Sequence, residues 1–348
     1  MIKTKIYGTI GPTSYQTDTL VKLIEKGMLG IRINLSHGNL PTYKKWIRNI
    51  KKAEEITGSR IPILADVQGP EIRTNSLKGK ENNNILLQEG KDIILTTDIG
   101  TGSKDLLYIN WPADQSQFRL EENLMPDQII LIDDGLIKLR VKAIENRKIN
   151  CKILRGGLLG ERKGVNIPDI KIPLPSITAR DRKDIELGIK LGIDFIMLPF
   201  TRKIDDVKLL REFLNSKNGK EIGILAKIEN QEGIDNLESF IKDVEGIVIA
   251  RGDLGVEIGI TKVPVVQKEI IRLCNKYNKQ SIVVTHMLQS MIESPLPTRA
   301  EISDIANAVL DGCNGVMLTG ETAVGKHPVE AVKIMYQTVY QTEKWKQN

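Results

Sequence analysis

The chain has 348 residues, of which 41% are hydrophobic and 27% are charged, with a formal net charge of +6. These proportions are typical of a globular protein with room for one large domain, a smaller one and an ample core. Scattered lysines and an aromatic content of only 4% argue against a nucleic-acid partner. No apolar run approaches the length of a membrane span, so a membrane partner is not expected either.

The cysteines indicate the compartment. Cys151, Cys274 and Cys313 are dispersed and lack metal-ligand spacing, which fits free thiols in a reducing compartment. The N-terminal stretch MIKTKIYGTIG contains no secretory h-region, so a cytoplasmic location is expected. The mild positive charge favours anionic metabolites as substrates.

Apolar runs of strand length alternate with amphipathic helical stretches along most of the chain. The expected strands are Lys5–Ile10, Gly30–Leu35, Ile61–Asp66, Phe195–Phe200, Ile222–Glu229, Gly246–Arg251, Ser281–His286 and Gly315–Leu318. Regular βα alternation predicts a parallel sheet, and eight repeats predict an α/β fold of the (β/α)8 TIM barrel class. A doubly wound open sheet is the alternative, because periodicity does not separate the two.

The alternation stops between Glu71 and about Val165, where no helical pattern is found. The short strands expected there are Ile85–Leu87, Ile93–Thr96, Ile129–Ile132, Leu136–Ala143 and Asn150–Leu154, with turn residues at 82–84 and 133–135. We predict a small all-β domain of residues 71–165, inserted after the third barrel strand. Residues 1–70 and 166–348 would then form the barrel.

The segment from Glu221 to Glu257 carries the strongest chemical signal. Side chains alternate along a strand, so Lys227 and Glu229 point to the same side. A strand–helix–strand arrangement places Asp253 beside them at the carboxyl end of the sheet, where barrel enzymes carry out their chemistry. Two carboxylates in one small site suit Mg²⁺. An interior ion pair or a solvated strand end is the alternative reading.

Other strand ends add polar groups to the same rim. Arg32, Asn34 and Ser36 share one face, which offers a guanidinium for phosphate and two oxygens for a cation. The third strand ends at Asp66, and Arg73 follows it. The seventh strand is followed by Thr285 and His286 and the eighth by Thr319-Gly320-Glu321-Thr322.

Eight motifs resemble those of the pyruvate kinase family. They are TIGPTS at 9–14, RINLSHG at 32–38, GPEIRT at 69–74, KGVNIP at 163–168, AKIENQEG at 226–233, ARGDLGVE at 250–257, PTRAEISDIANAVLDG at 297–312 and GETAVGKHP at 320–328. The resemblance implies a (β/α)8 barrel with an inserted β lid. It also implies transfer of a phosphoryl group from phosphoenolpyruvate to ADP, with Mg²⁺ (or Mn²⁺) and K⁺ as cofactors.

The resemblance further implies roles for single residues. Glu229 and Asp253 would bind the divalent metal, Gly252 would offer its N–H to the substrate carboxylate, and Lys227 and Arg32 would contact the transferred phosphoryl group. The other implied residues are Thr285 beside the enolpyruvate carbon, Thr319 and Glu321 on the proton route, Asn34, Ser36, Asp66 and the Val67 carbonyl around K⁺, and Asn34, His37, Arg73 and Lys163 toward the nucleotide. Glu71 stands where relatives that need no K⁺ tend to carry Lys, so K⁺ dependence is expected.

Three departures from the family pattern keep a second hypothesis open. His286, Pro199 and Val324 replace the usual Gln, Ser and Lys. They alter the surroundings of the site and spare the metal positions, so a related Mg²⁺-dependent enolate enzyme, or a kinase for another 2-oxo or hydroxy acid, is the alternative. A non-catalytic binding protein would be expected to lose Lys227, Glu229 or Asp253, and all three are present.

The chain stops just after the eighth helix, where most relatives continue into a C-terminal domain with an effector site. Effector activation by the usual route is therefore expected to be missing. If the chain self-associates, a homodimer formed through the barrel is the simplest symmetric expectation.

Overall fold

The structure is a computed structural model that describes residues 2–36, 38–78, 83–110, 120–168, 170 and 174–347. The chain divides into two compact units. The first consists of Met1–Gly69, Arg180–Leu254 and Thr261–Asn348, and the second of Pro70–Ala179 and Gly255–Ile260. The inserted domain predicted at 71–165 lies within the second unit.

The first unit is a closed barrel of eight strands. These are β1 (Lys5–Ile10), β2 (Gly30–Asn34), β3 (Ile63–Asp66), β13 (Phe195–Leu198), β14 (Gly223–Ile228), β15 (Gly246–Ala250), β16 (Gln280–Val284) and β17 (Gly315–Leu318). Every pairing is parallel, and β1 closes the barrel by pairing with both β2 and β17. The barrel is confirmed, and the open sheet is excluded.

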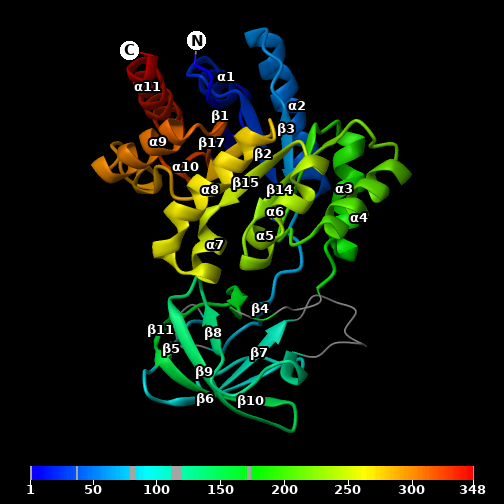
Figure 1. Ribbon diagram of the computed structural model, residues 1–348, viewed down its shortest axis with the longest axis vertical. Helices are drawn as coiled ribbons and strands as arrows, with labels where there is room; N and C mark the ends of the chain where they lie inside the picture. Colours follow the sequence, from blue (N-terminus) through cyan, green and yellow to red (C-terminus); the bar gives the residue numbers. More distant parts are fainter. Residues whose placement is uncertain are drawn as a thin grey trace. The chain divides into compact units, whose positions relative to one another are not determined.

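Helices follow the strands and lie around the outside of the barrel (Figure 1). They are α1 (Thr17–Glu25), α2 (Leu40–Thr57), α3 (Ala179–Leu191), α4 (Ile204–Ser216), α5 (Gln231–Asp235), α6 (Leu237–Phe240), α7 (Arg251–Ile258), α8 (Val263–Lys276), α9 (Arg299–Asp311), α10 (Gly320–Ala323) and α11 (Pro328–Gln347). Helix α2 begins at the Asn39 cap, whose side chain accepts the Thr42 N–H, and ends at Gly58 in the left-handed conformation. No helix in the described ranges is both long and apolar enough to cross a membrane.

The barrel interior is a packed apolar layer with polar positions above it. The layer contains Tyr7, Leu64, Met197, Leu225, Val248, Ala250, Ile282, Val284 and Met317. Two residues farther along their strands, Tyr7, Leu64 and Leu225 are followed by Thr9, Asp66 and Lys227. Because side chains alternate with a period of two, these three polar groups continue the inward-facing column. The barrel therefore carries its polar groups at the carboxyl ends of its strands.

The second unit is built on antiparallel strands with a core of its own. Its strands are β4 (Arg73–Thr74), β5 (Ile85–Leu87), β6 (Asp92–Thr96), β7 (Leu106–Asn110), β8 (Ile129–Ile132), β9 (Ile137–Glu145), β10 (Lys148–Arg155), β11 (Gly157–Leu159) and β12 (Val165–Asn166). Seven of them form one sheet in the order β12-β8-β9-β10-β6-β7-β4, in which only β6 and β7 pair in parallel, and β11 pairs with β5. The all-β insertion is confirmed, while β4, β7, β11 and β12 were not predicted.

The turn predicted at 133–135 joins β8 to β9. Asp133, Asp134 and Gly135 all have positive φ, of 57°, 52° and 79°, a conformation that Asp and Gly tolerate best. At the other predicted turn, Asn83 has a φ of 58°, and Asn82 lies outside the described residues.

Candidate active site at the carboxyl rim of the barrel

Four charged side chains on three barrel strands, or directly after one of them, meet at the carboxyl rim, and we call them the charged cluster: Arg32, Asp66, Lys227 and Glu229. The Lys227 Nζ atom lies 2.9 Å from Glu229 Oε1 and 3.3 Å from Asp66 Oδ1. Arg32 holds the other Asp66 oxygen, Oδ2, at 2.6 Å from Nη2 and 2.8 Å from Nε. Asp66 thus joins two cations, and Lys227 joins two carboxylates.

The charged cluster is almost closed to solvent. The side chains of Lys227 and Arg32 are each 14% exposed, and those of Asp66 and Glu229 are 3% and 1% exposed. Burial costs each charged group several kcal/mol of desolvation free energy, and pairing often does no more than offset this cost. A buried charged cluster therefore adds little to the stability of the fold. Buried charges at a barrel rim are more typical of a working site.

Burial and charge act against each other on the pKa values. Burial by itself would lower the pKa of Lys227, but Asp66 and Glu229 outweigh it and raise that pKa above its usual range. Burial would raise the pKa of Asp66, but Lys227 and Arg32 outweigh it and lower that pKa. Lys227 is therefore a fixed ammonium near neutral pH, and Asp66 is a fixed carboxylate.

Glu229 and Asp253 stand on neighbouring elements. Glu229 directly follows β14, and Asp253 lies in the first turn of α7, which begins immediately after β15. Burial and then the Asp253 charge raise the pKa of Glu229, and Lys227 opposes them. Gly252 lies inside the first helical turn of α7. N–H groups in a first turn have no carbonyl partner within their own helix, so the N–H expected to meet a substrate carboxylate is oriented by α7.

Two groups that were not predicted support the charged cluster. The Thr9 hydroxyl accepts a hydrogen bond from Arg32 Nη1 at 3.1 Å and donates one to the Leu318 carbonyl at 2.9 Å. The Phe200 N–H donates to Glu229 Oε2 at 2.8 Å. Thr9 is a polar residue in the buried part of β1, which could have singled it out. A backbone donor such as Phe200 leaves no mark in the sequence.

The residues assigned to K⁺ lie at the ends of β2 and β3, where Asn34 and Asp66 are register partners. The Asn34 side-chain oxygen accepts the Ser36 N–H at 2.9 Å, and the Ser36 carbonyl accepts from Arg180 at 3.1 Å. Val67 is buried. His37, which was assigned to the nucleotide, lies outside the described residues.

Thr319 and Glu321 meet at the end of β17. Glu321 is fully buried, and its carboxylate accepts the N–H groups of Leu288 at 2.9 Å and Thr319 at 2.7 Å. The Thr319 hydroxyl also donates to it at 3.2 Å. Glu321 therefore ties the segment after β16 to the segment after β17. Thr285, on the first of these segments, is half-buried with a φ of 79°.

Arg73 and Lys163 belong to the second unit. Arg73 pairs with Glu71 at 2.6 Å and donates to the Arg162 carbonyl at 2.8 Å. Lys163 pairs with Asp133 at 2.9 Å. Both cations thus have partners within their own unit.

The three departures from the family pattern differ in their surroundings. His286 and Val324 are exposed, and His286 has a φ of 55°. Pro199 packs on Gly69, where an added Cβ would come within 2.5 Å of the proline ring. Because Gly69 also has a φ of 72°, no other residue suits that position.

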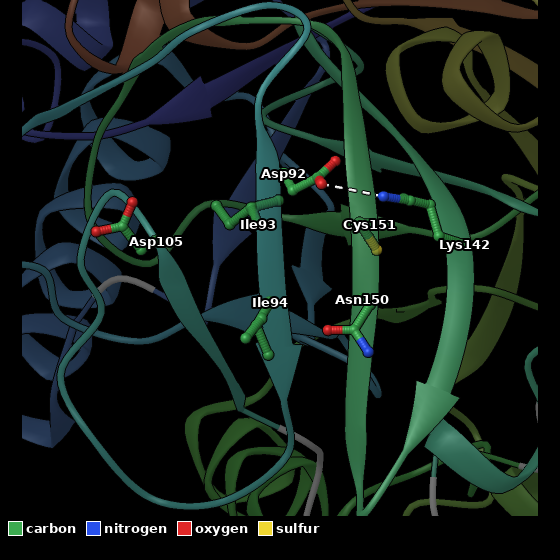
Figure 2. A pocket seen from close by; sticks show the side chains of 7 residues that line it. All are labelled: Asp92, Ile93, Ile94, Asp105, Lys142, Asn150 and Cys151. Carbon is green, nitrogen blue, oxygen red and sulfur yellow. Dashed lines mark hydrogen bonds and ion pairs between the residues drawn. The ribbon is translucent and has the colours of Figure 1, made fainter.

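A separate pocket of about 330 Å³ lies on the sheet of the second unit (Figure 2). It is lined by Asp92, Ile93, Ile94, Asp105, Lys142, Asn150 and Cys151. Lys142 donates to Asp92 at 3.0 Å across it, and none of the predicted site residues lines it. The rim of the barrel, not this pocket, assembles the groups with a recognisable chemistry.

The rim suits a hard cation that takes few protein ligands. Glu229 and Asp253 could supply carboxylate oxygens, since each Glu229 oxygen bonded by Lys227 or Phe200 keeps a second lone pair. Among the described residues no group of three or more His, Cys, Asp or Glu could hold a metal. A two-carboxylate site matches Mg²⁺, which takes its remaining ligands from substrate and water.

The comparisons with known proteins agree on one family. A family model described as "Pyruvate kinase, barrel domain" matches residues 1–332. A pyruvate kinase of Geobacillus stearothermophilus is 45% identical over 343 residues, which make up 98% of this chain and 57% of the relative. The pyruvate kinase of Bacillus licheniformis is 43% identical over 345 residues, or 99% of this chain and 57% of the relative.

The pyruvate kinase of Clostridium perfringens (strain 13 / Type A) is 41% identical over 343 residues, or 99% of this chain and 71% of the relative. The chain thus spans a little more than half the length of the first two relatives and about seven tenths of the third. With the barrel, the inserted unit and the charged cluster in place, these matches show that the chain belongs to the pyruvate kinase family.

Proposed function

We propose that this chain transfers the phosphoryl group of phosphoenolpyruvate to ADP and gives pyruvate and ATP. In this reaction the enol P–O bond breaks, a new P–O bond forms to the β-phosphate of ADP, and the enolate carbon takes up a proton. The observation that carries the proposal is the charged cluster, in which Lys227 is fixed as an ammonium beside Glu229 at the barrel rim. The names of the relatives support the choice of substrates.

Glu229 and Asp253 would hold Mg²⁺ or Mn²⁺. When bound, the ion would supply positive charge for the enolate and carboxylate oxygens of the substrate. Glu229 is already aimed by the Phe200 N–H at 2.8 Å, so its carboxylate has little freedom to lose on binding. The Gly252 N–H would meet the substrate carboxylate at the N-terminus of α7.

Lys227 and Arg32 would stabilise the phosphoryl group in flight. Transfer of this kind proceeds through a loose transition state with charge spread over the equatorial oxygens, so fixed positive charges are the main protein contribution. Asp66 would keep the two cations in place, because it forms ion pairs with Arg32 at 2.6 Å and with Lys227 at 3.3 Å. Because the site is nearly closed to water, the electrostatic interaction of these charges with the phosphoryl oxygens would be stronger than in bulk water.

The remaining assignments follow the family pattern. Asn34, Ser36, Asp66 and the Val67 carbonyl would surround K⁺, and Asn34, His37, Arg73 and Lys163 would serve the nucleotide. Thr285 would lie by the enolpyruvate carbon, and Thr319 would belong to the proton route. We assign Glu321 to the same route through its bond to the Thr319 hydroxyl at 3.2 Å.

The setting of the enzyme is also part of the proposal. We propose a cytoplasmic protein, since all three cysteines are buried free thiols, and a homodimer formed through the barrel.

A coupled assay with phosphoenolpyruvate and ADP tests the function, with and without Mg²⁺ and K⁺. The proposal expects pyruvate and ATP in equal amounts, loss of activity without Mg²⁺, and strong stimulation by K⁺. Equal rates in K⁺-free Tris buffer would sink the K⁺ assignment alone. Turnover of another 2-oxo or hydroxy acid, with none of phosphoenolpyruvate, would replace the proposed substrate.

A further inference from the structure

Arg251, the first residue of α7, has a set of contacts that none of the assigned roles uses. Its side chain is only 13% exposed. Nη2 and Nε donate to the Thr285 carbonyl at 2.7 and 3.2 Å, and Nη2 also contacts Met287 Sδ at 2.9 Å. On the other side, Nη1 lies 2.8 and 2.7 Å from the two oxygens of Asp304 on α9.

The backbone conformation of Thr285 is unfavourable and requires support from neighbouring groups. Its φ of 79° lies in the region that L residues rarely adopt, and for a β-branched residue such a value is an outlier. His286 follows with a φ of 55°, so two successive residues have an unfavourable backbone conformation. Strain of this kind persists only where neighbouring groups determine it, and here two N–H groups of Arg251 grip the carbonyl between the strained residues.

The Arg251 guanidinium is itself held by side chains of α8 and α9. Both carboxylate oxygens of Asp304 pair with Nη1 of Arg251, and the Gln267 side chain on α8 accepts a hydrogen bond from Nη1 at 3.4 Å. A planar guanidinium with a carboxylate on one edge and a carbonyl on the other has little rotational freedom. Asp304 on α9 therefore holds Arg251 in place, and Arg251 in turn fixes the position of the Thr285 backbone.

We propose that Arg251 and Asp304 are positioning residues that hold the Thr285 hydroxyl in place for the reaction. The proposal rests on the proposed function, because it takes Thr285 as a group beside the substrate. Arg251 also precedes Gly252 and Asp253 directly, so one side chain couples the α7 end of the site to the Thr285 end. An added Cβ on Gly252 would lie 3.1 Å from Thr285 Cγ2, which shows how closely the two ends approach.

Arg211 offers a matched control. It donates from Nη1 to the Ile222 carbonyl at 2.7 Å and from Nη2 to Glu245 at 3.3 Å, so it too joins a carbonyl to a carboxylate. Ile222 and Glu245 immediately precede β14 and β15, so this link lies at the amino ends of the strands, away from the rim. Replacing either arginine by lysine keeps the charge and removes the fork.

The first experiment compares Arg251→Lys with Arg211→Lys in the full chain. We expect kcat for pyruvate formation to fall about 10- to 100-fold in Arg251→Lys, which is the rate loss typical of a slightly misplaced catalytic group. The KM should change by less than about 3-fold. Arg211→Lys should keep kcat within about 2-fold. Asp304→Asn leaves Arg251 in place without its anchor and should lower kcat about 3- to 10-fold, which keeps the test usable if Arg251→Lys folds poorly. Unchanged kcat in both rim variants would overturn the proposal.

The second experiment asks whether Arg251 acts through Thr285. In the Thr285→Ala background no hydroxyl remains to be positioned, so adding Arg251→Lys should lower kcat by less than about 2-fold further. A purely structural arginine would multiply the two losses, and that result would contradict the proposal.

Amide hydrogen exchange separates this proposal from the proposed function. Residues 285–291 should exchange at least about 10-fold faster in Arg251→Lys than in the wild type, and no such change is expected in Arg211→Lys. If the wild type forms no pyruvate, the proposed function fails, and exchange alone decides whether Arg251 holds this segment. Equal exchange in all three proteins would overturn the anchoring.

Discussion

At the scale of single residues, Asp66 explains how two cations can share one dry site. Arg32 and Lys227 would repel each other, yet each binds a different oxygen of Asp66. The family pattern assigns Asp66 to K⁺, whereas its contacts give it the further task of balancing both cations. The sequence predicts that Asp66 lies at the carboxyl rim of the barrel, but it does not reveal which charges the barrel curvature brings into contact with it.

Asp66→Asn should therefore both inactivate and destabilise the protein. Removal of one partner from a buried ion pair costs about 3–5 kcal/mol, because an uncompensated charge remains. Asp206 is a matched control, since Arg202 and Asp206 have the same side-chain exposures, 14% and 3%, as Arg32 and Asp66. Urea unfolding should show a loss of stability in both variants. Only Asp66→Asn should lose phosphoryl transfer, and full activity in that variant would contradict the assignment.

At the scale of elements, the barrel strands were predictable to within two residues at either end. They are continuous apolar runs buried on both faces, as in β15, where all five residues are buried. The missed strands β4 and β12 have two residues each, too few to show any periodicity. Helix α7 begins directly after β15, and its first residue, Arg251, donates to the Thr285 carbonyl, a long-range contact that no local sequence pattern reveals.

The start of α9 offers a clean test at this scale. Thr298 and Glu301 form a capping box, with the Glu301 N–H donating to Thr298 Oγ1 at 3.2 Å and the Thr298 N–H to Glu301 Oε2 at 2.7 Å. Thr298→Ala should lower the free energy of unfolding by about 1 kcal/mol, and Thr298→Ser should restore most of it. Denaturant titration measures both. A loss in the serine variant as large as in the alanine variant would show that the hydroxyl is not the cause.

At the scale of the whole molecule, each compact unit has a buried core, and the cysteines report on them separately. Cys151 is fully buried in the core of the second unit, and Cys274 and Cys313 are buried in the barrel unit. Burial raises the pKa of all three thiols to about 12, so at pH 8 the folded protein should present no reactive thiolate.

Thiol labelling in increasing urea should then resolve two transitions. The second unit is the smaller, and smaller units bury a lower fraction of their surface, so Cys151 should become reactive at lower urea than Cys274 and Cys313. Mass spectrometry of labelled peptides assigns each cysteine. A single shared transition would show instead that the two units unfold cooperatively.

We infer that Lys227 acts as a fixed charge on the phosphoryl group and does not handle the proton. Lys227→Met removes the ammonium and roughly keeps the length of the side chain. The most direct measurement follows two reactions of this variant in D₂O by NMR, phosphoryl transfer from phosphoenolpyruvate to ADP and exchange of pyruvate methyl protons with solvent. Transfer should fall by at least about 10²–10³-fold, the scale of one preorganised donor, while methyl exchange largely survives because it does not need this charge. If exchange collapses together with transfer, Lys227 delivers the proton and the assignment is wrong.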